Sequence, residues 1–88
     1  MLQLPATLTH DQASACLREL GQALATEPGP AVLDATALIS FDSSALAVLL
    51  ELQRAGARLN KKVVVQGLSD RLMALAILYG VEGLLGGA

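Results

Sequence analysis

The stretch Phe41-Asp42-Ser43-Ser44-Ala45-Leu46 marks the point where a strand-like run ends and a strongly apolar helix begins. A strand that leads directly into a helix is the repeating unit of an α/β fold. Asp and Ser favour the N-cap of a helix, because their side-chain oxygens accept hydrogen bonds from the free N–H groups of the first turn. A helix N-terminus also favours negative charge. The turn therefore predicts one of three roles: a cap for the helix, a contact for an acidic group, or a site of phosphorylation.

Two strand-like runs flank this junction and its helix. Residues 31–37 form a short, mostly apolar run after a Pro-Gly-Pro breaker, and residues 62–67 contain three consecutive valines. Consecutive β-branched residues favour a buried strand. The helix between the runs is expected at about 44–59. Because parallel neighbours need a crossover connection, this order predicts an α/β domain.

The remaining elements have local signals of their own. Thr9 and Gln12 have the spacing of a capping box, and Gly80 is a residue that commonly ends a helix. The elements expected are a short edge strand at 2–4, a helix at about 10–25, a helix at about 70–79 and one further short element within 81–85.

Length and composition limit the architecture. The chain has 88 residues, of which 53% are apolar and 16% charged, so we expect one globular domain over residues 1–88. The expected fold class is α/β, a single layered domain with a short mixed sheet covered by about three helices. Only Phe41 and Tyr79 are aromatic, so the core must consist of aliphatic side chains.

Charge and hydropathy exclude several classes of partner. The formal net charge is −2, and the largest basic cluster is Lys61-Lys62, which gives no basis for binding nucleic acid or an anionic membrane surface. No apolar run reaches about eighteen residues, so direct membrane insertion is not expected and the location should be cytoplasmic. The lone cysteine, Cys16, lies on an apolar helix face and is expected to pack rather than react.

The sequence offers no recognisable catalytic set. His10 is the only histidine and lies far from Ser43 along the chain, and no Gly-x-Ser-x-Gly elbow, Walker A loop or paired Cys/His set is present. Asp34 and Asp42 could approach each other at adjacent strand ends, but two carboxylates are too few to define a metal site. A Ser/Lys arrangement stays open. We expect a protein that is not an enzyme and needs no cofactor or metal.

Two helices carry more apolar surface than one sheet needs. A broad stripe of the helix at 44–59 can cover the sheet, and Leu46 and Leu50 lie outside this stripe. Met73 and Ile77 form a similar pair on the helix at 70–79. A chain this short cannot cover all of these faces, which predicts a protein-binding surface. The alternative is that a small domain simply exposes some apolar side chains.

The segments Leu33-Asp34-Ala35-Thr36 and residues 41–50 resemble the signature of the STAS family, the domain of anti-sigma factor antagonists and sulfate transporter tails. In regulatory members the residue after the turn's Asp is phosphorylated, and here that residue is Ser43. Residues 64–70 and 75–81 are similar to the MlaB-like branch, the STAS subunit of the bacterial Mla phospholipid transporter.

The resemblance to the MlaB-like branch implies an accessory subunit. Its partner would be the cytoplasmic ATP-binding cassette ATPase of a transporter that maintains outer-membrane lipid asymmetry, which would hold the chain at the inner face of the inner membrane. The alternative is an antagonist of an anti-sigma factor kinase, switched by phosphorylation at Ser43. The expected partner-binding residues are Asp42, Ser43, Ser44, Leu46, Leu50, Met73 and Ile77.

The chain departs from the family pattern in two respects. The family has a further N-terminal strand, so the sheet is expected to be one strand short or to pair its edge with another chain. The family also has Gly where this chain has Ala45, a side chain that could obstruct the docking of a kinase.

Overall fold

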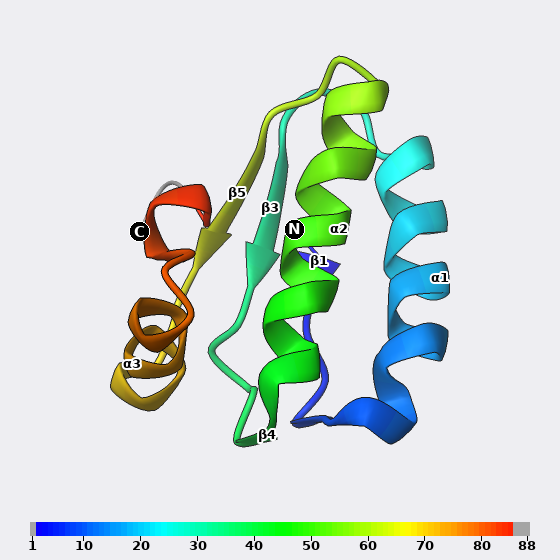
Figure 1. The fold of residues 1–88 in the computed structure, drawn as a ribbon. Helices are drawn as coiled ribbons and strands as arrows, with labels where there is room; N and C mark the ends of the chain where they lie inside the picture. The colour runs from blue at the N-terminus through cyan, green and yellow to red at the C-terminus, as the bar shows by residue number, and fades with distance from the viewer. Residues whose placement is uncertain (1, 86–88) are drawn as a thin grey trace.

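Three parallel strands form the main sheet of the computed structural model, which describes residues 2–85 (Figure 1). These strands are β1 (Leu2–Gln3), β3 (Ala31–Asp34) and β5 (Val63–Gln66), in the order β1-β3-β5. Leu33 in the central strand lies opposite Leu2 on one side and Val65 on the other. β1 lies at the edge, as the sequence predicted.

A second, smaller ladder was not expected from the sequence. β2 (Thr7–Leu8) and β4 (Ser40–Phe41) form a two-stranded parallel pair. Each strand has only two residues, too few to show an alternating pattern. The α/β class is confirmed. The sheets of residues 2–85 differ from the mixed sheet we expected in that every pair is parallel.

The three helices lie where the sequence predicted them, within one residue at each end: α1 (His10–Thr26), α2 (Ser43–Arg58) and α3 (Asp70–Leu78). A short 3₁₀ turn, η1 (Glu82–Leu84), follows α3. Figure 1 shows α1 and α2 side by side with their N-termini at the same end, whereas α3 lies beyond β5. No helix within residues 2–85 is long and apolar enough to cross a membrane.

The core lies between the main sheet and the helices. Leu33, Leu49, Leu52 and Val65 have no exposed surface. α2 approaches β5 closely at Gly56, where a Cβ would lie 2.3 Å from Val63 Cγ2. Glycine is therefore required there for the helix to pack on the strand.

Both ends of α1 are held by polar contacts. At its start the predicted capping box is present, since Gln12 Oε1 accepts the Thr9 backbone N–H at 2.9 Å. At its other end Lys61 Nζ donates to the carbonyl oxygens of Leu24, at 2.6 Å, and Glu27. A cation is favourable there because the C-terminus of a helix carries partial negative charge.

Candidate functional site

Asp42 joins the N-termini of two helices. It is the N-cap of α2, and its Oδ1 accepts the backbone N–H of Ser44 at 2.8 Å. Its Oδ2 accepts the backbone N–H of His10, the first residue of α1, at 3.1 Å. The hydrogen bond from Ser44, followed by that from His10, lowers the pKa of the Asp42 carboxyl below its usual range. Asp42 therefore fixes the turn as an anion.

Ser43 is the first residue of α2, and its side chain is exposed. Within residues 2–85 its hydroxyl makes no hydrogen bond, because Asp42 already caps the helix. Of the two residues that could cap α2, Asp42 does so and Ser43 does not. Ser44 is half-buried and contributes its backbone N–H to the cap. The turn thus presents the Ser43 hydroxyl to solvent at a helix N-terminus.

A hollow of about 530 Å³ lies between this turn and α3, and we call it the α2–α3 hollow. The Arg71 guanidinium carbon lies 5.1 Å from the centroid of the Phe41 ring, within cation–π range, so the pair joins α3 to β4. The hollow is lined by Phe41, Asp42, Ser43, Arg71, Ala74, Leu75 and Tyr79.

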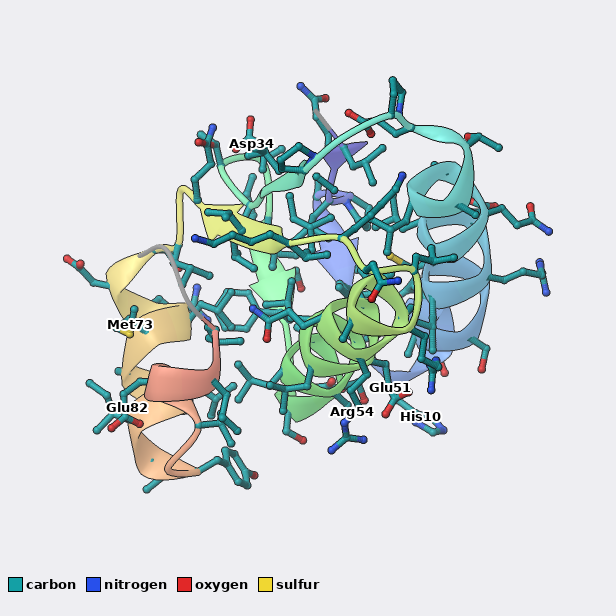
Figure 2. The ribbon with its side chains drawn as sticks, turned by 90° about the horizontal axis from the view of Figure 1, so that it is seen from above. His10, Asp34, Glu51, Arg54, Met73 and Glu82 are labelled. Carbon is teal, nitrogen blue, oxygen red and sulfur yellow. The ribbon has the colours of Figure 1, made fainter. Side chains whose placement is uncertain are left out.

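The end of α3 exposes three consecutive apolar side chains, of which Tyr79 also lines the hollow. Ile77, Leu78 and Tyr79 are 58%, 77% and 57% exposed, and we call these three the α3 apolar face. Leu72 and Ala76, earlier in the same helix, are buried. Met73 is half-buried, on the side of the molecule remote from α1 (Figure 2). Met73 and Ile77 therefore keep accessible surface, as expected.

The end of α3 exposes more apolar surface than the sequence predicted. Tyr79 has the helical spacing of the buried stripe with Leu72 and Ala76, but it lies at the C-cap of α3 and is exposed. Sequence reasoning missed Leu78, although the near-continuous apolar composition of residues 72–78 signalled it. The accessible apolar surface of α3 therefore includes Leu78 and Tyr79 in addition to Met73 and Ile77.

Leu46 is only 4% exposed and belongs to the core, so its assignment to a partner-binding surface is wrong. Leu50, one turn later, is half-buried. The C-terminal segment covers this flank of α2, since Gln53 Nε2 donates to the Leu85 carbonyl oxygen at 2.7 Å. Leu50 and Leu84 line a shared hollow beside it. A helical projection of α2 alone cannot show that a segment from later in the chain covers one of its flanks.

Asp34 and Asp42 hold separate turns and do not form an acidic pair. The Asp34 carboxylate accepts the backbone N–H of Thr36 at 2.9 Å and also its hydroxyl, and the hydroxyl contributes most to lowering the pKa of Asp34. Figure 2 shows Asp34 on the opposite side of the molecule from His10, to which Asp42 is bonded. Within residues 2–85 no group of three or more His, Cys, Asp or Glu side chains could hold a metal ion.

The side chains of Cys16 and Ala45 are both buried. Cys16 is buried, and desolvation, followed by the charge of Glu19, raises the pKa of its thiol. The thiol is therefore protonated and unreactive at neutral pH, in line with a packing role. The Ala45 methyl group is also fully buried, so it does not stand in the way of a protein docking at the turn.

The comparison with protein families identifies one match along nearly the whole chain. A family model described as "Mlab, STAS domain" matches residues 1–86. No curated protein matches the chain. The matched range includes the Asp42 turn, the α2–α3 hollow and the α3 apolar face.

Proposed function

The chain belongs to the STAS domain family, in its MlaB-like branch, and from this we propose that it is a non-catalytic accessory subunit of a phospholipid ABC transporter of the Mla type. It binds the cytoplasmic ATPase of the transporter and supports its assembly and activity. Through this partner it acts at the inner face of the inner membrane, in the maintenance of outer-membrane lipid asymmetry.

The α3 apolar face is the observation that carries this proposal. Three consecutive apolar side chains at the end of α3 are each more than half exposed, and one of them, Tyr79, lines the hollow beside the turn that marks the family. Exposed apolar patches with a polar surround mark protein interaction sites. Here Ser43 and Arg71 supply polar groups along the edge of the patch. The surface therefore suits a protein partner better than a small polar substrate.

The test is co-expression with an Mla-type transporter ATPase from the same organism. We expect the two proteins to elute together in size-exclusion chromatography, and ATP hydrolysis by the complex to exceed that of the ATPase alone. The matched control is Ile77→Lys together with Leu78→Lys, which should keep the fold and abolish co-elution. An ATPase that is equally soluble and active without the chain, and does not bind it, would refute the proposal.

The exposed Ser43 hydroxyl favours a second candidate, an antagonist of an anti-sigma factor kinase that is switched by phosphorylation. A kinase requires a hydroxyl that is accessible and not committed to a cap, and Ser43 meets both conditions. Affinity capture followed by mass spectrometry separates the two functions. Recovery of a transporter ATPase supports the first, whereas recovery of a serine kinase with phosphate on Ser43 supports the second.

A further inference from the structure

Arg71 lies at a position where helix electrostatics disfavours it. It is in the first turn of α3 (Asp70–Leu78), and a helix N-terminus carries partial positive charge that opposes a cation. No carboxylate within residues 2–85 forms an ion pair with Arg71, and its recorded interaction is the stack on the Phe41 ring. Arg71 is exposed, so its charge is available to a group on another molecule.

The carboxylate that shares the hollow with Arg71 is already engaged. Both oxygens of Asp42 accept backbone N–H groups, one from Ser44 and one from His10. Within residues 2–85 the Arg71 guanidinium makes no hydrogen bond to that carboxylate. The rest of the hollow consists of apolar walls and the hydroxyls of Ser43 and Tyr79. A cation with unused donors thus stands at the border of an apolar surface.

We propose that the ATPase partner inserts an Asp or Glu side chain into the α2–α3 hollow, where its carboxylate pairs with Arg71. Apolar side chains beside that acid cover the α3 apolar face. The inference rests on the proposed function and adds the chemistry of the contact. Arginine forms two parallel hydrogen bonds to a carboxylate, and the Phe41 ring places the guanidinium at the hollow by a cation–π contact.

The charge of the whole chain makes this contact selective. The formal net charge is −2, so an acidic group on a partner is repelled on average and attracted locally at Arg71. Complementary charges of this kind fix the orientation of two surfaces and reject other partners. Arg71 therefore sets the register in which the apolar surfaces meet.

The experiment is a binding titration of the full chain against the purified ATPase. Arg71→Glu should raise Kd by about 30-fold or more, the effect of breaking a desolvated charge pair. Arg71→Lys keeps the charge and loses the bidentate geometry, so its Kd should lie between those of the parent chain and Arg71→Glu. Arg58→Glu is the matched control, because Arg58 is exposed in the last turn of α2, at the opposite end of that helix from Ser43. It should leave Kd unchanged.

A reciprocal measurement identifies the acid, once circular dichroism has shown that Arg71→Glu is folded. Surface Asp and Glu residues of the ATPase are changed singly to Arg, and one of these variants should weaken binding to the parent chain and restore binding to Arg71→Glu. Equal binding of the parent chain and Arg71→Glu, or rescue by no ATPase variant, would overturn the inference while leaving the proposed function intact. A parent chain that fails to bind the ATPase would refute the proposed function itself. A dimer of this chain in light scattering, lost in Arg71→Glu, would mean that a second copy fills the hollow, and would also overturn the inference.

Discussion

At the residue scale, one carboxylate organises the turn that marks the family. Asp42 accepts N–H groups from the first turns of both α1 and α2, whose residues are far apart in the sequence. The N-terminal turn of each helix has N–H groups without an intrahelical partner, and a single anion satisfies one in each helix. This arrangement leaves the neighbouring Ser43 hydroxyl without a structural role in residues 2–85.

Replacing Asp42 should therefore weaken two helix ends at once. We expect Asp42→Ala to lower the melting temperature by several degrees, and Asp42→Asn by less, because an amide keeps one acceptor oxygen. Thermal melts followed by circular dichroism measure this. Ser14→Ala on the exposed face of α1 is the control and should melt like the parent. An Asp42→Ala variant as stable as the parent would show that the carboxylate does not hold the turn.

The stabilisation by Asp42 should depend on pH. Its pKa is lowered in the folded chain, so the carboxylate stabilises the fold fully above the unfolded pKa of about 3.9. The contribution is lost as the pH falls through the lowered folded pKa. The difference in melting temperature between parent and Asp42→Ala should thus be constant near neutral pH and shrink in acid. A difference that instead grows in acid would contradict this assignment.

Ser43 should prove dispensable for folding and important for binding. Ser43→Ala should melt like the parent, because its hydroxyl makes no hydrogen bond in the described structure. Ser43→Glu should also fold, since a helix N-terminus tolerates negative charge even though Asp42 opposes it. At an apolar interface the added charge must lose its water, so binding to the ATPase should weaken strongly. If Ser43→Glu binds as tightly as the parent, the turn lies outside the interface.

At the scale of elements, α3 has two faces with different tasks. Leu72 and Ala76 are buried and hold the helix, whereas the α3 apolar face is exposed. α2 differs, because the flank that carries Leu46 and Leu50 is covered by the C-terminal segment. The surface offered to a partner therefore belongs mainly to α3 and to the first turn of α2.

Substitutions on the two faces of α3 should separate stability from binding. Leu72→Ala should lower the free energy of unfolding by about 2–5 kcal/mol, because it opens a cavity in the core. Ile77→Lys together with Leu78→Lys should leave it nearly unchanged, because both side chains are exposed and lysine is favourable in the last turn of a helix. Urea denaturation measures these changes. Loss of folding in the double variant would show that these side chains support the core.

Leu46→Asp provides the contrasting case on α2. Its side chain is 4% exposed, so this variant places an unpaired charge in the core and should not fold. The far-ultraviolet circular dichroism spectrum reports the outcome directly. A folded Leu46→Asp variant would mean that the C-terminal segment can leave this flank of α2.

At the scale of the whole molecule, stability is distributed unevenly. α2 contributes six buried residues to the core and α3 contributes two. Figure 1 shows α2 in front of the sheet with α1 at its side, whereas α3 lies at one side beyond β5. An element with few buried contacts opens locally at a lower free energy than the core. The helix that carries the proposed binding face is thus less tied to the rest of the domain than α2 is.

Hydrogen exchange should show this difference in local stability between α3 and the core elements. In the free chain the amides of α3 should exchange faster than those of α2 and β3, and the addition of ATPase should slow α3 most. The amides of α1 serve as the internal control and should change little. Equal protection of α2 and α3 in the free chain would contradict the uneven distribution, and an unchanged α3 in the complex would place the interface elsewhere.

The sequence by itself determined the helices and the longer strands of this protein. Their signals are local: the capping box at Thr9, the Ser69 start and Gly80 stop around α3, and the valines of β5. The turn at Asp42 was also predictable, because a cap depends on residues adjacent in the chain. The order of these elements was enough to predict the α/β class.

The tertiary structure alone decided which side chains remain at the surface. Leu46 is buried in a core cluster that also contains Leu85, and Tyr79 is exposed because residues 80–85 do not cover it. The two-residue strands β2 and β4 exist only as partners of each other. Arg71 meets Phe41 across 30 positions of sequence. Burial and side-chain pairing depend on segments distant in the chain, whereas periodicity and capping record only near neighbours, and this is why the sequence predicted the elements but not the full composition of the site.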